Sequence, residues 1–133
     1  MRRVLADTSA YSAFLRGHAG VGSALREADE IRVTPVVLGE LLAGYRRGNK
    51  RRANESDLRR FLASPRVGVV GIDEETAEAY ATIVTFLRTS GAMLPTNDLW
   101  IAASAMQHGL AVLTTDADFL RIPQILVDHH PVG

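Results

Sequence analysis

Short, mostly apolar runs alternate with longer amphipathic stretches along the whole chain, and this alternation predicts strands that are followed by helices. The predicted strands are residues 4–6, 31–34, 67–72, 111–114 and 125–127. The predicted helices are residues 8–16, 21–28, 35–45, 56–62, 74–87 and 96–108. Strands with few polar positions are typical of a parallel sheet that is covered by helices on both faces. The sequence therefore predicts one three-layer α/β domain that spans residues 1–133.

Capping residues set the boundaries of several predicted helices. Pro35 suits a first helical turn, Asp73 can cap the long helix that follows it, and Gly109 can end the last helix. The long helix is expected to bury one face, which consists of Ala77, Tyr80, Ala81, Val84 and Leu87. The charge-rich stretch 46–54 is expected to be a short loop between helices, and the histidines at 129–130 are expected to belong to a frayed tail.

Four acidic residues occupy positions that a parallel sheet would bring together. Asp7 follows the first predicted strand and Asp116 follows the fourth, so both lie at the carboxyl edge, where open α/β sheets bind ligands. Asp98 begins a largely apolar helix, and Glu40 lies among leucines with no partner nearby in the sequence. Converging carboxylates raise one another's pKa unless a cation binds them. The four acids therefore predict a Mg²⁺ or Mn²⁺ site, because these cations prefer oxygen ligands.

Each acid taken alone has a purely structural explanation. Asp7, Asp98 and Asp116 can cap or stabilise the starts of helices. Glu40 faces solvent if its helix is rotated from the predicted orientation. One shared pocket explains all four positions together, and this favours the metal site.

Composition excludes several other kinds of site. The chain has no cysteine, which excludes a thiolate zinc site, a thiol nucleophile and a disulfide scaffold and is typical of a cytoplasmic protein. Its 15 basic and 15 acidic residues cancel, so net charge does not indicate a nucleic-acid partner. The longest uncharged stretch, residues 99–115, contains polar residues and is a poor membrane span, and the apolar run before Asp7 is too short for a signal peptide.

Four blocks of the chain carry a resemblance to a known family. They are residues 5–9 (LADTS), 34–44 (TPVVLGELLAG), 97–103 (NDLWIAA) and 114–119 (TTDADF). In this order they resemble PIN-domain nucleases and, more narrowly, VapC toxins. The resemblance implies a PIN-like fold with a sheet of about five strands, and a Mg²⁺- or Mn²⁺-dependent endoribonuclease. It also implies a homodimer that a VapB-type antitoxin inhibits.

The resemblance also assigns roles to individual positions. Its acidic quartet matches Asp7, Glu40, Asp98 and Asp116, and a less uniform fifth acid matches Asp118. Family hydroxyls that support the site match Thr8 or Ser9 and Thr114 or Thr115. Many relatives carry Asn where this chain has Thr115. The expected reaction is in-line attack of a metal-activated water on an RNA phosphodiester, with one or two cations.

A run of basic residues closely follows the Glu40 helix. It contains Arg46, Arg47, Lys50, Arg51 and Arg52. Because a phosphate chain needs positive charge beside the acidic site, these side chains are predicted to line the RNA path. The alternative is a solvated basic loop without a ligand.

Three other functions remain open at this level. One is a housekeeping RNA-processing nuclease of the same family, and another is a noncatalytic binding module. A third is a phosphoryl-transfer enzyme with Asp7 as nucleophile, although the second acid of such enzymes is replaced here by Ser9. Metal-dependent cleavage of RNA, formation of a phosphoaspartate, or neither would distinguish these classes.

Overall fold

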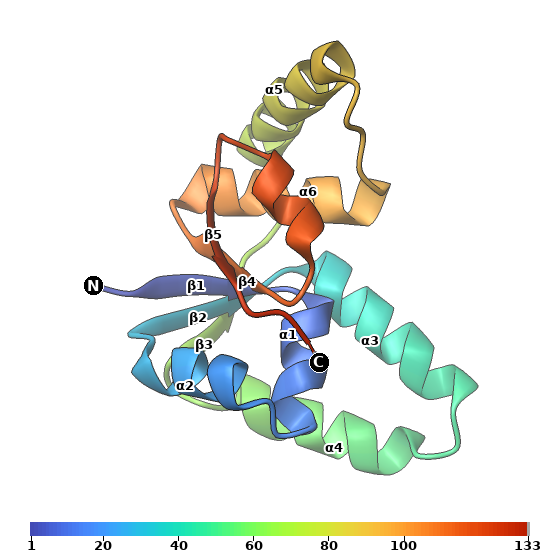
Figure 1. Cartoon of the computed structure of the whole chain (residues 1–133). Coiled ribbons are helices and arrows are strands. Elements are labelled where there is room, and N and C mark those ends of the chain that lie inside the picture. Colours follow the sequence, from blue (N-terminus) through green and yellow to red (C-terminus); the bar gives the residue numbers. More distant parts are fainter. Residues whose placement is uncertain (133) are drawn as a thin grey trace.

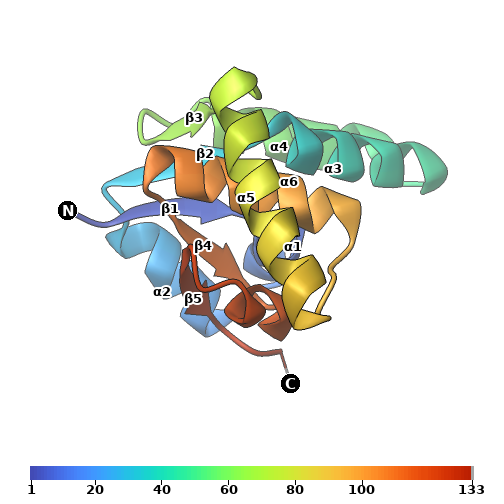
Figure 2. The same cartoon turned by 90° about the horizontal axis from the view of Figure 1, so that it is seen from above.

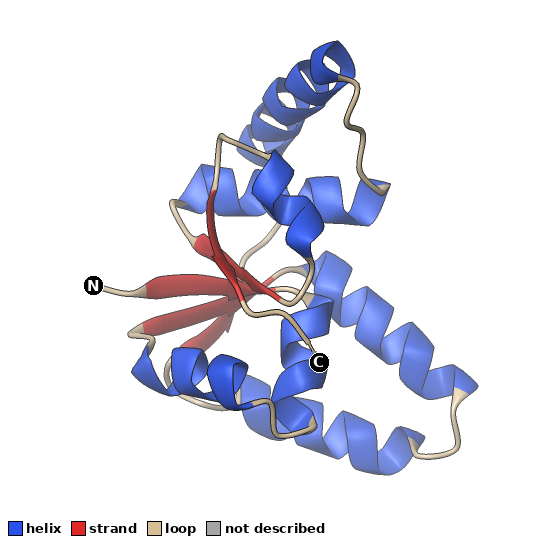
Figure 3. Cartoon of the chain, in the orientation of Figure 1, coloured by secondary structure: helices blue, strands red, loops and turns tan. Residues whose placement is uncertain are grey.

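Five parallel strands form the central sheet in the order β3-β2-β1-β4-β5 (Figure 1). The computed structural model describes residues 1–132. The strands are β1 (Arg3–Ala6), β2 (Glu30–Val33), β3 (Val67–Val69), β4 (Ala111–Thr114) and β5 (Leu126–His129). The predicted parallel sheet with helices on both faces is confirmed, and Figure 3 shows the strands between the helical layers.

The helices complete the outer layers. They are α1 (Thr8–Leu15), α2 (Ala19–Glu27), α3 (Pro35–Arg47), α4 (Arg51–Leu62), α5 (Glu74–Ser90), α6 (Thr96–His108) and the 3₁₀-helix η1 (Ala117–Arg121). Alternate residues of β1 enter different cores, since Val4 packs with α1 and α2 whereas Leu5 packs with α5 and α6. Helix α5 packs on α6, and α3 with α4 forms a hairpin that extends away from the sheet (Figures 1 and 2).

The strand order reverses direction between β1 and β4. From β1 the chain builds outward through β2 to β3, and it then returns to the other side of β1 to form β4 and β5. Leu5 therefore pairs with Arg32 of β2 on one side and with Val112 of β4 on the other. The crevice at the carboxyl ends of two such strands is the usual ligand site of an open α/β sheet. Asp7 and Asp116 follow these two strands.

Several predicted helix boundaries agree with the structure. Pro35 is the first residue of α3, behind a Thr34 side chain that accepts from the Val37 amide. Asp73 caps α5, and Gly109 ends α6 with a φ of 65°, a conformation that glycine adopts without strain. The sequence predicted these helix ends because the capping preferences of Pro35, Asp73 and Gly109 depend only on the local backbone.

The predicted buried face of α5 is partly wrong. Val84 and Leu87 are buried as expected, but Ala77 and Ala81 are exposed and Tyr80 is half-buried. The buried residues of α5 are Thr76, Ala79, Ile83, Val84 and Leu87. The buried face follows the large apolar Ile83 and Leu87, which lie on the same side of the helix as Ala79 and Thr76, and the Thr76 hydroxyl contacts Gln107 of α6.

The stretch 46–54 is not a loop. Helix α3 continues through Arg47 and α4 begins at Arg51, so only three residues connect the two helices. The start of α4 was not predicted because Leu58 is the one buried residue of this helix. A helix that is mostly exposed shows no periodic pattern of apolar residues in the sequence. Strand β3 is also shorter than predicted, because its single neighbour, β2, ends at Val33, which pairs with Val69.

The expectation of a frayed tail at 129–130 is wrong. His129 is the last residue of β5, and the His130 amide donates to the Thr114 carbonyl at 2.9 Å. The His18 ring caps α2 through Nδ1, and its Nε2 lies 3.1 Å from the carbonyl of Pro131. The tail is thus tied to β4 and to the start of α2.

Among residues 1–132, no helix is long and apolar enough to cross a membrane.

Candidate functional site

Asp7 is buried at the carboxyl ends of β1 and β4. Its Oδ1 accepts from the Ala10 amide and the Ser9 hydroxyl, both at 2.8 Å, and its Oδ2 accepts from the Thr114 hydroxyl at 2.6 Å. Burial raises the pKa of Asp7, while the bonds from Thr114, Ala10 and Ser9 oppose the rise and the charge of Asp116 adds to it. Asp7 therefore caps α1 and also faces another acid of the predicted set.

Glu40 receives its partners from distant parts of the chain. The Thr8 hydroxyl donates to Oε1 at 2.6 Å, and the Asn97 side-chain amide donates to Oε2 at 3.2 Å. The half-buried side chain therefore lies between α1 and α6 and is not turned out to solvent. The sequence offered no local partner because both donors come from other helices.

Asp98, in the first turn of α6, shows that the acids share one region. Its pKa is raised to about 6, mainly by burial and then by the negative charges of Asp116, Asp7, Glu40 and Asp118. The five side chains come from the starts of α1, α6 and η1 and from the middle of α3. Negative charge thus concentrates at the carboxyl edge of the sheet, beside the point between β1 and β4 where the strand order reverses. We refer to these five clustered acids, Asp7, Glu40, Asp98, Asp116 and Asp118, as the acidic region.

Asp116 and Asp118 differ in how the structure holds them. Asp116 caps η1 by accepting from the Asp118 amide at 2.9 Å, and its own amide donates to the Thr114 hydroxyl. Asp118 is half-exposed and lies 3.6 Å from the guanidinium of Arg121 on the next turn. A cation that competes for Asp118 has to displace a local ion pair, whereas no such pair holds Asp116 within residues 1–132.

Three of the four candidate hydroxyls contact acids, and the fourth does not. Thr8 holds Glu40, while Ser9 and Thr114 hold Asp7. Thr115 contributes its backbone amide to Ser9 Oγ at 3.0 Å, and its hydroxyl forms no hydrogen bond within the described chain. Sequence reasoning did not select Asn97 as a site residue, although its position directly before Asp98 was a usable signal.

The chemistry of the donors fits a hard divalent cation better than it fits zinc. Every candidate ligand atom is a carboxylate oxygen, and the mutual repulsion seen at Asp98 is relieved when a cation binds. Across residues 1–132, however, no three His, Asp or Glu side chains lie close enough together to hold a metal ion as they stand. The oxygens of Asp7 and Glu40 instead accept from hydroxyl and amide groups.

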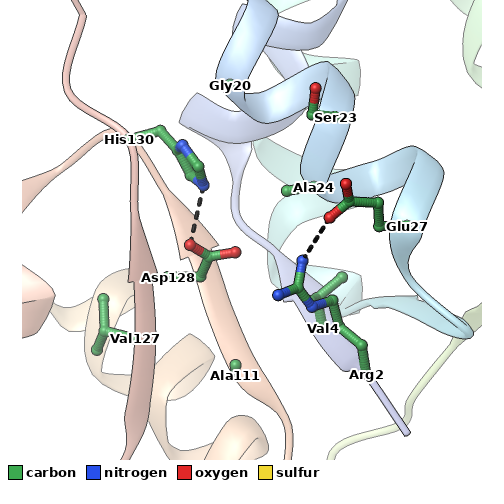
Figure 4. Close-up of a pocket in the computed structure, with 10 residues that line it drawn as sticks. All are labelled: Arg2, Val4, Gly20, Ser23, Ala24, Glu27, Ala111, Val127, Asp128 and His130. Carbon is green, nitrogen blue, oxygen red and sulfur yellow. Dashed lines mark hydrogen bonds and ion pairs between the residues drawn. The ribbon is translucent and has the colours of Figure 1, made fainter.

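A separate cavity of about 450 Å³ lies between α2 and the β4–β5 edge (Figure 4). In this cavity Arg2 forms an ion pair with Glu27 at 2.9 Å, and the His130 ring lies 2.9 Å from the Asp128 carboxylate. None of the five clustered acids lines this cavity. The acidic region at the carboxyl edge is therefore distinct from this cavity.

The chain matches the PIN domain family over residues 4–125. Ribonuclease VapC4 of Mycobacterium tuberculosis is 36% identical over 132 residues, which cover 96% of each chain. Ribonuclease VapC of Rickettsia bellii is 32% identical over 128 residues, which cover 93% of each chain. The similarity thus extends over nearly the whole sequence, and the matched range contains the positions of all five clustered acids.

Solved structures with the same fold come from toxin-antitoxin systems. VapBC-5 of Mycobacterium tuberculosis superposes with a TM-score of 0.74 at 29% identity, covering 97% of this chain and 98% of the other. A DNA-bound VapBC of Salmonella typhimurium superposes with a TM-score of 0.85 at 22% identity, with the same coverage of 97% and 98%. At this level of identity, the similarity to the Salmonella typhimurium structure shows the shared fold alone.

Proposed function

Because the chain belongs to the PIN-domain family and, within it, to the VapC ribonucleases, we propose that it is a metal-dependent endoribonuclease and the toxin of a toxin-antitoxin pair. One observation supports this function most directly. Burial, and then the charges of four other carboxylates, raise the pKa of Asp98 at the crevice where an open α/β sheet binds its ligands. Clustered carboxylates repel the phosphates of an RNA substrate, so an enzyme can use them only when a cation neutralises their charge.

The residues that would hold the cation are Asp7, Glu40, Asp98 and Asp116, with Asp118 as a further candidate. Asp98 accepts no hydrogen bond within residues 1–132, so its carboxylate is available to a ligand without losing a partner. Mg²⁺ keeps several of its waters, so carboxylates that are not in direct contact with one another can still bind it through water. When bound, Mg²⁺ or Mn²⁺ supplies a water nucleophile of lowered pKa and neutralises charge on the phosphate.

The remaining polar groups act by fixing the acids. Thr114 and Ser9 hold both oxygens of Asp7, and Thr8 with Asn97 holds Glu40. In the proposed reaction the oxygen of water bonds to phosphorus and releases a proton, while the bond from phosphorus to the opposite ribose oxygen breaks and that oxygen takes up a proton. Fixed carboxylates favour this in-line geometry because they do not have to reorganise as the charge moves.

The partners follow from the family. The solved relatives include VapBC complexes, and we extend to this chain the same kind of partner, a VapB-type antitoxin. The acidic region would attract a basic side chain of such a partner, because arginine pairs strongly with carboxylates.

A homodimer is part of the same proposal, and light scattering of the purified chain measures it. A small DNA-binding gene beside this one would support the toxin role, and its absence would favour a housekeeping ribonuclease.

Cleavage of labelled RNA tests the function. Purified protein is incubated with tRNA and rRNA fragments in Mg²⁺, in Mn²⁺ and in EDTA, and Asp7→Asn serves as the inactive control. We expect strand cuts that require the metal and that Asp7→Asn does not produce. Equal cutting by Asp7→Asn, or undiminished cutting in EDTA, contradicts the function. A phosphorylated aspartate without strand cuts would favour the phosphoryl-transfer alternative.

A further inference from the structure

Charge is distributed unevenly along this chain although its total is zero. Residues 46–60 contain seven of the 15 basic residues and two of the 15 acidic ones, which gives this segment a charge of +5. The other residues hold eight basic and 13 acidic side chains, a charge of −5. A strong local excess of positive charge is the electrostatic signature of a surface for nucleic acid.

The structure places this charge on the hairpin of α3 and α4, which extends from the sheet (Figure 1). We refer to residues 46–60 as the basic arm. Its seven basic side chains are all exposed, and they are Arg46, Arg47, Lys50, Arg51, Arg52, Arg59 and Arg60. Only Arg51 and Arg60 form ion pairs among residues 1–132, with Glu55 and Asp57. Most of the positive charge on the basic arm is therefore available to a ligand.

A surface pocket of about 390 Å³ lies on α4 within the basic arm. It is lined by Arg51, Arg52, Glu55 and Arg59. These positions share one face of the helix because they are three or four residues apart along it. Arginine presents a planar fork of donors that matches the oxygens of a phosphate group. The pocket thus has the charge and the donors to hold a phosphodiester.

The single acid of this pocket, Glu55, is bonded to one of its arginines and lies close to others. Glu55 accepts from Arg51 Nε at 2.8 Å, and its side chain is 19% exposed whereas that of Arg51 is 55% exposed. The Arg51 hydrogen bond holds the pKa of Glu55 below its ordinary value, and the charges of Arg46 and Arg59 act in the same direction. Glu55 therefore holds Arg51 in place, and its charge reduces the repulsion among the arginines close to it.

The start of α4 adds to the attraction for an anion. Lys50 occupies the N-cap position without a side-chain cap, and the first turn of the helix contains no acidic residue. The first amide groups of a helix have no partner within it, and they carry the positive end of the helix dipole. In α4 this end is not neutralised and lies next to Arg51 and Arg52 of the pocket.

We propose that Arg51, Arg52 and Arg59 form a phosphodiester-binding pocket for single-stranded RNA, and that Glu55 is its positioning residue. This pocket deepens the proposed ribonuclease function and rests on it for its choice of ligand. Glu40 of the acidic region and Arg47 of the basic arm lie on the same helix, seven residues apart, or about 10 Å along its axis. RNA held at the acidic region can therefore continue along α3 onto the basic arm.

Binding of RNA without cleavage tests the pocket. A short fluorescent single-stranded RNA is titrated in EDTA over a range of salt concentrations, and gels confirm that it stays intact. The double variant Arg52→Gln/Arg59→Gln is compared with Arg26→Gln/Arg88→Gln, which removes the same charge from exposed sites on α2 and α5. Neither Arg52 nor Arg59 forms an ion pair within residues 1–132, so we expect the double variant to keep the wild-type fold.

The pocket variant is expected to bind RNA about tenfold more weakly than the wild-type chain. The slope of log binding constant against log salt concentration is expected to become shallower by about 1.4, or about 0.7 for each lost phosphate contact. The control pair is expected to retain the wild-type slope. Equal effects of the two pairs would overturn the pocket, since they would show that net charge alone matters. Binding of vesicles with anionic lipids in preference to RNA would overturn it as well.

Glu55→Gln tests the positioning role through the sign of its effect. This change removes a negative charge and keeps the shape of the side chain, so simple electrostatics predicts tighter binding of RNA. Loss of the arginine arrangement predicts weaker binding instead, and we expect a several-fold loss. Tighter binding by Glu55→Gln would show that this acid only neutralises the basic arm and would overturn its positioning role.

The two functions fail in different ways. Metal-dependent cleavage together with wild-type RNA binding by Arg52→Gln/Arg59→Gln would reject the pocket and leave the nuclease intact. Weakened RNA binding by that variant, with no cleavage by the wild-type chain in any metal, would reject the nuclease and leave an RNA-binding basic arm.

Discussion

The Thr114 hydroxyl donates to Asp7 Oδ2 at 2.6 Å, which joins two residues 107 positions apart in the sequence. Thr114 ends β4 and Asp7 follows β1, so this hydrogen bond crosses the point where the strand order reverses. The same hydroxyl oxygen accepts from the Asp116 amide at 2.9 Å. One side chain thus fixes the position of two acids of the proposed metal site.

Thr114→Val is expected to destabilise the protein by about 2 kcal/mol, because valine keeps the shape but leaves a buried carboxylate oxygen without its donor. Cleavage of RNA is expected to fall at least about tenfold, as is typical when a residue that orients a metal ligand is lost. Urea unfolding and a cleavage assay measure the two effects. Thr115→Val is the matched control, since the Thr115 hydroxyl forms no hydrogen bond within residues 1–132. Similar results for both variants would contradict the role of Thr114.

Asp98→Asn is expected to abolish cleavage and to stabilise the metal-free protein. The pKa of Asp98 is about 6 in the folded chain, against an ordinary value of 3.8, so the folded state binds this proton more tightly than the unfolded state. The metal-free protein therefore loses stability as pH rises from about 4 to about 6. The loss is at most about 1 kcal/mol, because solvent screens a half-exposed carboxylate.

Thermal unfolding in EDTA across this pH range measures the effect. The difference in stability between Asp98→Asn and the wild-type chain should grow as pH rises to about 6 and then stay constant. Glu78→Gln, an exposed change on α5, should show no such growth. A constant difference at every pH would mean that Asp98 does not titrate in this window.

Divalent cations are expected to stabilise the wild-type chain at neutral pH. A cation at about 100 times its Kd adds about 2.7 kcal/mol when it binds only the folded state. Glu40→Gln should reduce this gain, whereas Glu78→Gln should retain it, because Glu78 is exposed on α5 and is not one of the clustered acids. Melting temperatures with Mg²⁺, Mn²⁺ and Ca²⁺ measure the gain. Equal gains in both variants would place the cation away from Glu40.

The sequence predicted the architecture because local chemistry determines most of it. Apolar runs marked the strands, and Pro35, Asp73 and Gly109 marked helix ends through the backbone groups that they satisfy or the conformations that they allow. The convergence of Asp7 with Asp116 was also predictable. Both follow parallel strands, and such ends share one edge of a sheet.

Features that depend on contacts between distant elements were not predictable. Glu40 has its donors on α1 and α6, and nothing in its own neighbourhood of the sequence identifies Thr8 or Asn97 as those donors. The buried face of α5 includes Thr76, whose hydroxyl contacts Gln107 of α6. In each case the partner lies more than 30 positions away in the sequence, and only the assembled layers bring the two side chains together.

Gly20→Ala and Gly39→Ala are expected to change stability in opposite directions, although both replace a glycine within a helix. A Cβ at Gly20 would lie 2.7 Å from His130 Nδ1, so alanine displaces the ring and loosens the tail that is bound to β4. This overpacking should cost about 1–3 kcal/mol. A Cβ at Gly39 meets nothing within 4 Å, so alanine in the middle of α3 should stabilise by about 0.5–1 kcal/mol. Urea unfolding compares the two, and a gain in both variants would mean that the His130 ring moves aside without cost.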